Sequence, residues 1–276
     1  MRTVLLAVAG LVATGASVQA DELLERGAYL MNTIVACGNC HTPMGPEGPG
    51  PELSGGLPFD LPGFVSYAAN ITPDPETGIG DWNDEEIGRA IREGIGRDGE
   101  LLAPVMPAEF YQHLSDRDLA AIIAYLRQVE PVVSLVPETE FEMQLPPAWV
   151  EPVASVPEPD HDNPVAHGAY LAEIGHCMEC HTPRDDQGHL VFERMGAGGQ
   201  VFPGPWGESV SANITSHPEA GLGSWSDAEI KQAITHGISR NGTELQPPMA
   251  FAYYAGISDA DMDALIAWLR TVPPAE

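Results

Sequence analysis

The chain has 276 residues and a formal net charge of −28, from 40 acidic and 12 basic residues, with Lys231 as the only lysine. This charge argues against nucleic acid and anionic membrane surfaces as partners, because both repel a polyanion. Two interpretations of the acidic surface remain open. It is either a docking face for a basic partner protein or a general means of solubility in a saline habitat.

The start of the chain predicts an export signal. A short positive start is followed by an apolar run over 4–12 and by small residues up to Ala20. We expect residues 1–20 to be a signal peptide cleaved after Ala20, with the mature protein in the periplasm. The apolar run is shorter than the roughly 20 residues of a membrane span, so no span is expected in the mature chain. An uncleaved signal that stays as an anchor is the alternative.

A helix is predicted from about Leu23 into the pentapeptide Cys-Gly-Asn-Cys-His at 37–41, and Cys-Met-Glu-Cys-His at 177–181 repeats the pattern. Two thiols three positions apart can bond the two vinyl groups of one porphyrin, while the adjoining histidine binds its iron. A redox dithiol or half a zinc site does not require that histidine in both copies. We therefore expect two covalently bound haem c groups, held by Cys37, Cys40, His41, Cys177, Cys180 and His181.

The chain is a duplication, with matching segments about 143 positions apart. The matches include Gly-Ala-Tyr-Leu at 27–30 and 168–171, Ala-Asn-Ile-Thr at 69–72 and 212–215, and Ser-Asp-x-Asp at 115–118 and 258–261. We predict one domain over 21–130 and a second over 165–276. Each half is long enough to bury one small core.

Two further helices in each half are predicted from their first residues. The expected N-caps, each followed three positions later by an acidic residue, are Asn83, Ser115, Ser226 and Ser258. Gly27 and Gly168 are expected to let the first helix of each half cross the last one closely, near Tyr125 and Trp268, because a missing side chain lets backbones approach. The predicted fold class is all-α.

Residues 131–164 contain eight prolines and many acidic residues, which is typical of an extended connector. This Pro-rich acidic linker also contains Phe141, Leu145 and Trp149. We expect these three apolar side chains to hold the linker against the domains.

Met106 and Met249 are the predicted sixth ligands of the two irons. They lie 143 positions apart, beside prolines, and 65 and 68 residues after their motif histidines. This separation lets the chain wrap round a porphyrin to its other face. Ligation by a second histidine is the alternative, but every other histidine lacks a histidine at the matching position of the other repeat and is expected at the surface. These are His113, His161, His167, His176, His189, His217 and His236.

Several polar residues recur between the motif and the methionine. We predict that Asn70, Trp82, Asn213 and Trp225 donate hydrogen bonds to haem propionates, because polar groups beside a buried cofactor need partners. For Arg127 and Arg270, near the ends of the last helices, we expect loop capping and charge pairing instead.

Three motifs give the sequence a family resemblance: Arg-Gly-Ala-Tyr-Leu at 26–30, Cys-His-Thr-Pro at 40–43 and 180–183, and Asn-Ile-Thr followed by Gly-x-Gly-x-Trp. With them the chain resembles, over both halves, the multihaem cytochrome c subunits of bacterial membrane-associated dehydrogenases. The resemblance implies two tandem class I cytochrome c domains with histidine and methionine on each iron. It also implies that the protein accepts electrons from an alcohol, aldehyde, sugar acid or N-heterocycle dehydrogenase. Many of those subunits carry a third haem domain and a membrane anchor, whereas this chain stops at Glu276, so a free shuttle or a loosely docked subunit is expected.

The predicted function is that of a periplasmic di-haem cytochrome that transfers single electrons from a dehydrogenase towards an oxidase or another cytochrome. One alternative is a di-haem enzyme, such as a peroxidase or a thiosulfate-oxidising cytochrome. Such an enzyme needs an iron with an exchangeable sixth position, which the two methionines argue against. Another alternative is a docking module that never changes its redox state.

Overall fold

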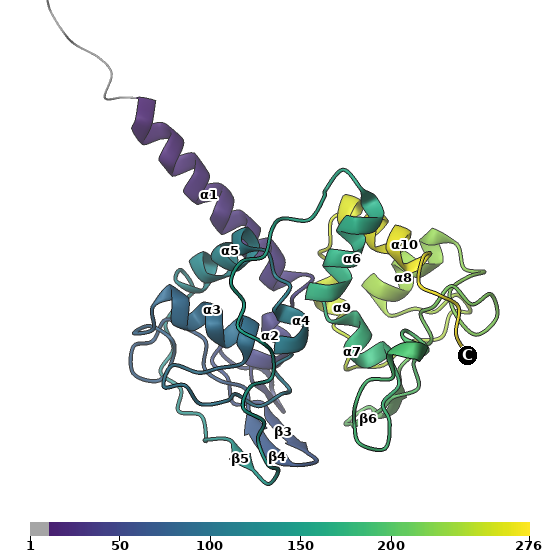
Figure 1. The fold of residues 1–276 in the computed structure, drawn as a ribbon, viewed down its shortest axis with the longest axis horizontal. Coiled ribbons are helices and arrows are strands. Elements are labelled where there is room, and N and C mark those ends of the chain that lie inside the picture. Colours follow the sequence, from purple (N-terminus) through teal and green to yellow (C-terminus); the bar gives the residue numbers. More distant parts are fainter. Residues whose placement is uncertain (1–10) are drawn as a thin grey trace, which may run out of the picture.

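A computed structural model describes residues 11–276 and shows two similar, mainly helical domains beside each other (Figure 1). The helices of the first domain are α1 (Leu11–Asn32), α2 (Cys37–His41), α3 (Asp84–Glu93), α4 (Ala108–Tyr111) and α5 (Asp116–Leu126). Those of the second are α6 (Pro164–Ile174), α7 (Cys177–His181), η1 (Phe192–Arg194), α8 (Asp227–His236), α9 (Phe251–Tyr254) and α10 (Asp259–Leu269).

The predicted signal peptide is described only from residue 11 onward, so the first part of its apolar run lies outside the described residues. Helix α1 continues through Ala20 into the first domain. Cleavage after Ala20 stays a prediction. Within residues 11–276 no helix combines the length and the apolar character that a membrane crossing needs.

The four predicted N-caps are confirmed, whereas the first helix begins at Leu11 and not at about Leu23. Asn83 and Ser226 cap α3 and α8, and in each case the acidic residue three positions later bonds back to the cap. Ser115 and Ser258 cap α5 and α10 with their side chains, which accept from the backbone N–H of Asp118 and Asp261. The prediction that the first helix runs into the haem motif was wrong, because α1 ends at Asn32 and the motif forms the separate helix α2.

The close helix crossings are also confirmed. A Cβ atom built on Gly27 would overlap the backbone carbonyl of Ala121 in α5 and press on Tyr125. On Gly168 it would overlap the carbonyl of Ala264 in α10. Glycine is therefore required at both crossings, since any side chain would force the two backbones apart.

The expectation of an all-α fold holds only in part, because each domain carries a β-hairpin between its haem motif and its recurrent asparagine. The hairpins are β3 (Pro58–Leu61) with β4 (Phe64–Tyr67), and β6 (Val201–Gly204) with β7 (Gly207–Val210). The first domain also has β1 (Met44–Gly45) with β2 (Gly48–Pro49), and the linker contributes β5 (Glu140–Phe141). Pro62-Gly63 and Pro205-Trp206-Gly207 supply the tight turns, since proline fixes φ and glycine accepts a positive φ.

The linker lies along the first domain, and two of its three predicted anchors are confirmed. Phe141 pairs with Phe64 as part of β5, with ring centroids 6.3 Å apart. The indole nitrogen of Trp149 donates to the carbonyl of Leu102 at 2.8 Å. Leu145 remains 38% exposed, so its prediction as an anchor was wrong.

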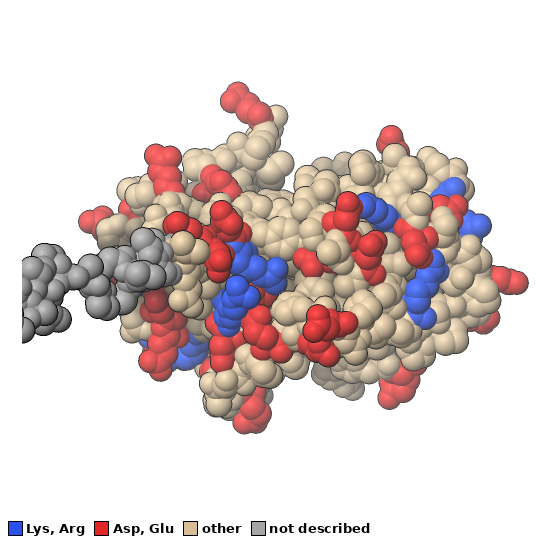
Figure 2. All heavy atoms as spheres, turned by 90° about the horizontal axis from the view of Figure 1, so that it is seen from above, with Lys and Arg blue, Asp and Glu red and all other residues tan. Residues whose placement is uncertain are grey.

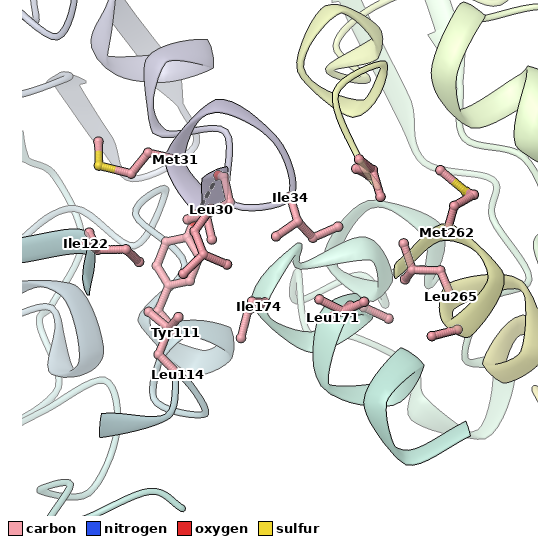
Figure 3. Close-up of a cluster of buried hydrophobic side chains, with 14 of the residues drawn as sticks. Leu30, Met31, Ile34, Tyr111, Leu114, Ile122, Leu171, Ile174, Met262 and Leu265 are labelled. Atoms are coloured by element: carbon pink, nitrogen blue, oxygen red, sulfur yellow. Dashed lines mark hydrogen bonds between the residues drawn. The ribbon is translucent and has the colours of Figure 1, made fainter. Parts of the chain in front are cut away.

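The two domains share one apolar core, to which residues at the end of α1 and in α6 contribute from opposite sides (Figure 3). Ile34 follows α1 in the first domain, and its side chain lies so close to Gly175, at the end of α6, that a Cβ atom built on this glycine would be 3.0 Å from Ile34 Cδ1. Leu30 and Leu171, which are equivalent in the repeat, are both fully buried. Because this core is continuous, the domains form a single packed unit.

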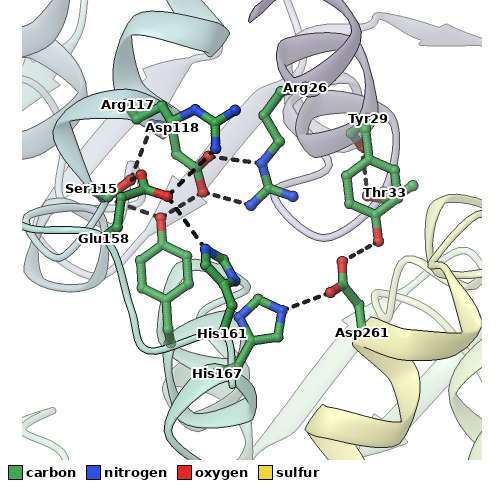
Figure 4. Close-up of polar contacts among 11 residues, drawn as sticks. Arg26, Tyr29, Thr33, Ser115, Arg117, Asp118, Glu158, His161, His167 and Asp261 are labelled. Carbon is green, nitrogen blue, oxygen red and sulfur yellow. Dashed lines mark hydrogen bonds and ion pairs between the residues drawn. The ribbon is translucent and has the colours of Figure 1, made fainter. Parts of the chain in front are cut away.

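A polar network beside this core joins the domains with approximate two-fold symmetry (Figure 4). The hydroxyl of Tyr29 donates to Asp261 at 2.5 Å and accepts from the backbone N–H of Ser258 at 3.1 Å. In the symmetry-related arrangement, the hydroxyl of Tyr170 donates to Asp118 at 2.7 Å and accepts from the N–H of Ser115 at 3.1 Å.

Each aspartate of this network also holds a second charged or titratable partner. Arg26 makes two hydrogen bonds to Asp118, at 2.8 and 2.7 Å. At the equivalent position, His167 Nε2 lies 2.7 Å from Asp261 Oδ1. The prediction that His167 is a surface residue was therefore wrong: it is only 7% exposed, because Asp261 from α10 meets it inside the interface.

Candidate haem sites

Each haem motif forms a short helix that presents two free thiols. The residue before each helix adopts a left-handed conformation, with φ 50° at Ala36 and 40° at His176. Burial raises the pKa of Cys37 to about 12 and that of Cys40 to about 11. The corresponding thiols of the second motif have raised pKa values for the same reason. Raised pKa values of this kind disfavour a reactive redox dithiol, whose nucleophile is a thiolate.

Elsewhere in the described chain, residues 11–276, no cluster of three or more His, Cys, Asp or Glu side chains is arranged to hold a metal ion. A metal site built from protein ligands alone therefore has no support in this region. The thiol pairs instead fit covalent attachment to a porphyrin, which needs only two thiols and the neighbouring histidine.

The motif histidines are oriented for iron ligation. His41 Nδ1 lies 2.7 Å from the carbonyl oxygen of Ala69, and His181 Nδ1 lies 2.7 Å from that of Ala212. Since a carbonyl can only accept, Nδ1 carries the hydrogen and Nε2 keeps the lone pair that a metal requires. Burial also lowers the pKa of both rings, which favours the neutral form that binds metal.

Met106 and Met249 occupy the same place in the two domains. Each is half-buried in a turn that comes directly before the short helix α4 or α9, and its carbonyl accepts a backbone hydrogen bond from that helix. The distance is 2.8 Å from Ala108 N to the carbonyl oxygen of Met106, and 3.0 Å from Phe251 N to the carbonyl oxygen of Met249. Neither methionine is held within a helix. Their role as sixth ligands stays a prediction.

The asparagines predicted to bind propionates fasten a loop. Both amide hydrogens of Asn70 are used, by Thr77 Oγ1 at 3.1 Å and by the carbonyl of Val132 at 2.8 Å, so none is left for a propionate. Asn213 donates to the carbonyl of Ala275 at 2.7 Å, which is the equivalent position. Each side chain therefore ties the Asn-Ile-Thr loop to the segment that follows the last helix.

The recurrent tryptophans and arginines meet at the start of α3 and α8. Trp82 and Trp225 are half-buried against the core, and a propionate contact by either stays a prediction. Arg127 binds the carbonyl of Trp82 and Asp84, and Arg270 binds the equivalent carbonyl and aspartate. The two arginines thus cap loops, as the sequence predicts, and they also pair with acidic residues at the starts of α3 and α8.

The two haem motifs face each other across the interface, which sequence reasoning missed. Tyr111 of α4 lies edge-on to His176, directly before the second motif, with ring centroids 5.8 Å apart. Phe110 packs with Met178 inside that motif. In return, the hydroxyl of Tyr253 in α9 lies against Gly38 of the first motif. Each helix that follows a methionine therefore covers the haem motif of the other domain.

Two repeats, each with a haem-attachment motif, an oriented histidine and a methionine turn, define a c-type cytochrome with two haem sites. In agreement, residues 22–126 match the family model for cytochrome c oxidase, cbb3-type, subunit III, and residues 165–273 match that for cytochrome c. The chain is 30% identical over 264 residues to a diheme cytochrome c-type protein of Cereibacter sphaeroides, covering 87% of this chain and 83% of that protein. The chain belongs to the di-haem c-type cytochromes and binds two haem c groups covalently.

Longer relatives match over nearly the whole chain. The fructose dehydrogenase cytochrome subunit of Gluconobacter japonicus is 34% identical over 269 residues, which cover 91% of this chain and 52% of the relative. The gluconate 2-dehydrogenase cytochrome c subunit of Pantoea cypripedii is 32% identical over 276 residues, covering 91% and 60%. This chain therefore spans little more than half the length of these two relatives.

Proposed function

We propose that this protein is a periplasmic electron carrier that accepts single electrons from a dehydrogenase and delivers them to a respiratory acceptor, either an oxidase or another cytochrome. The observation that carries the proposal is the pairing of two equivalent haem sites whose motifs face each other across a packed interface. Bound haem c supplies reversible one-electron chemistry, and methionine ligation raises its potential relative to two histidines. The chain contributes the ligands, the covalent attachment and a fixed distance between the two sites.

A dehydrogenase as electron donor is supported by the relatives, several of which are named as cytochrome subunits of fructose, gluconate or alcohol dehydrogenases. The acidic surface supports a donor or acceptor with a basic docking face. Figure 2 shows acidic side chains spread over both domains on one face of the molecule, with only a few basic ones among them. Charge complementarity of this kind mainly increases the rate of association and decreases with salt.

The periplasmic location is supported by the export signal that the sequence predicts. Its direct test is the mass of the purified holoprotein. A chain that begins at Asp21 and carries two haem groups agrees with the proposal, and a chain that retains residue 1 contradicts cleavage.

Anaerobic reduction by a dehydrogenase tests the function. The oxidised holoprotein is mixed with a purified sugar or alcohol dehydrogenase and its substrate, and the absorption of reduced haem is recorded. We expect both haems to be reduced, at a rate that falls as salt is added. The same mixture without substrate is the control.

Two results would contradict the carrier function. Reduction of neither haem by any such dehydrogenase, nor by a mild chemical donor, would indicate a docking module. Turnover of peroxide or thiosulfate by the protein alone would indicate an enzyme.

A further inference from the structure

The hairpin of the first domain is completed by a third strand from the linker. β5 pairs antiparallel with β4, with Phe141 opposite Phe64 and Glu140 opposite Val65. The carbonyl of Gly63 accepts backbone hydrogen bonds from Glu142 at 2.8 Å and Met143 at 3.0 Å.

This third strand buries part of β4. The Ser66 hydroxyl lies 2.9 Å from the hydroxyl of Thr139, just before β5. Phe64 is only 6% exposed and Ser66 only 4%. The part of the outer edge of β4 that pairs with β5 is therefore covered by the chain itself.

The equivalent edge in the second domain is open. β7 lies 143 positions after β4, and within residues 11–276 it pairs with β6 alone. Three of its four residues are exposed, among them Val210 at 60%. A Cβ atom added to Gly207, the counterpart of Phe64, would meet nothing within 4 Å. Both hairpins lie at the same end of the molecule (Figure 1).

The backbone of Glu208 points to this open edge. Glu208 is opposite Pro203 in β6, which has no N–H to donate. The two residues therefore form a non-hydrogen-bonded pair, and the N–H and C=O of Glu208 point away from β6. Its counterpart Val65 is the residue that pairs with Glu140 of β5. An exposed edge of this kind is a ready template for another strand.

We propose that the outer edge of β7 binds an extended strand of a partner polypeptide, in the place that β5 occupies on the first domain. Two features define that strand. An aromatic residue opposite Gly207 would cover the bare glycine, as Phe141 covers the same position of β4. A lysine or arginine opposite Glu208 would pair with its carboxylate. In the first domain the equivalent pair is Glu140 of the linker opposite the uncharged Val65.

The test uses the natural covering strand as a probe. A synthetic peptide with the sequence of residues 137–145, and a second peptide with Glu140→Lys, are titrated into the reduced holoprotein while backbone amide signals are followed by nuclear magnetic resonance. We expect the lysine peptide to shift the amides of Glu208 and Val210 and to bind about five-fold more tightly than the native peptide. The Glu208→Lys variant should reverse that order.

Two further variants make the result decisive. Glu208→Pro removes the outward N–H from an edge strand, where proline is tolerated, and should abolish binding. Glu219→Lys makes the same change of charge at an exposed residue outside the hairpin and should leave the order of the peptides unchanged. Equal affinity of both peptides for the native protein and Glu208→Lys would overturn the proposal, even if Glu208→Pro fails to fold. So would sedimentation as a dimer that Glu208→Lys dissociates, because the edge would then be occupied by a second copy of the chain.

Discussion

A single hydrogen bond decides the chemistry of each motif histidine. His41 and His181 both use Nδ1 to reach a loop carbonyl, at 2.7 Å in each case. That bond selects the tautomer and holds the ring plane, so the lone pair of Nε2 has a fixed direction. At the predicted sixth ligands, the turns that carry Met106 and Met249 are held by backbone hydrogen bonds, and Met106 also packs against the core.

Replacing Met106 with alanine tests the sixth ligand at the first site. The oxidised spectrum should lose half of its methionine-to-iron absorption band, and one of the two potentials should fall by on the order of 0.1 V, a fraction of the range that axial ligands set. The matched control is Met44→Ala, since Met44 is 63% exposed and follows the motif too closely to reach the other face of the haem. If Met106→Ala left the band unchanged, another residue would have to be the sixth ligand of that iron.

At the scale of elements, two features of the helices come from short sequence patterns. The N-caps could be predicted because a side-chain acceptor and the acidic residue three positions later interact within one helical turn. The crossings at Gly27 and Gly168 are visible because the repeat places a glycine at the same point of both first helices.

The hairpins were missed for an equally physical reason. The four-residue strands β3, β4, β6 and β7 are too short to show an alternating pattern, and one edge of β4 is completed by linker residues more than 70 positions later. The structure of the linker was only partly predictable, since burial of Phe141 depends on β4 while Leu145 stays 38% exposed.

Substituting Gly168 with alanine should destabilise the protein. The added methyl group would overlap the carbonyl of Ala264, and such overpacking costs about 1–3 kcal/mol of unfolding free energy. Denaturant unfolding of the holoprotein measures the effect. Gly45→Ala is the control and should stay within about 0.5 kcal/mol, because its nearest neighbour is an ordinary contact at 3.8 Å. Equal stability of both variants would show that the crossing can relax.

The attachment of the linker to α5 should depend on pH. Asp116 accepts hydrogen bonds from Ser155 Oγ at 2.6 Å and Val156 N at 3.1 Å, and with Arg92 they hold the pKa of Asp116 below its usual value. A carboxylate with a depressed pKa contributes stability above the unfolded value of about 3.9 and loses it as pH falls through the folded pKa.

We therefore expect the linker to detach from α5 below about pH 4, which hydrogen exchange at the amide of Val156 would detect. In Asp116→Asn this amide should exchange quickly at every pH and show no step in acid. A step that persists in Asp116→Asn would assign the transition to another group.

At the scale of the whole molecule, the domains are joined by a contact that the sequence did not reveal. Tyr29 and Tyr170 were recognised as part of the repeat, but each bonds to the last helix of the other domain. No local pattern predicts a contact between residues 232 positions apart, such as Tyr29 and Asp261. The burial of His167 and the apposition of the two haem motifs were missed for the same reason.

Removing one tyrosine hydroxyl should loosen one half of the interface. Tyr29→Phe leaves the N–H of Ser258 and one oxygen of Asp261 without a partner, at a cost of about 1–3 kcal/mol. The amide of Ser258 should then exchange roughly 5- to 150-fold faster, whereas that of Ser115 should not change. Tyr170→Phe should give the opposite result, so the two variants control for each other. Equal acceleration of both amides would mean that the interface opens as one unit.

The two-fold contact has a consequence for how such a protein can diverge. In a dimer of identical subunits, every substitution at the interface occurs on both sides of the axis at once. Here the two sides belong to one polypeptide, and their sequences already differ: Arg26 faces Asp118, whereas His167 faces Asp261. Because the two copies are fused, a substitution near one haem changes the surroundings of that haem and leaves those of the other haem unchanged. A covalent tandem can acquire a direction for electron flow that a symmetric dimer cannot.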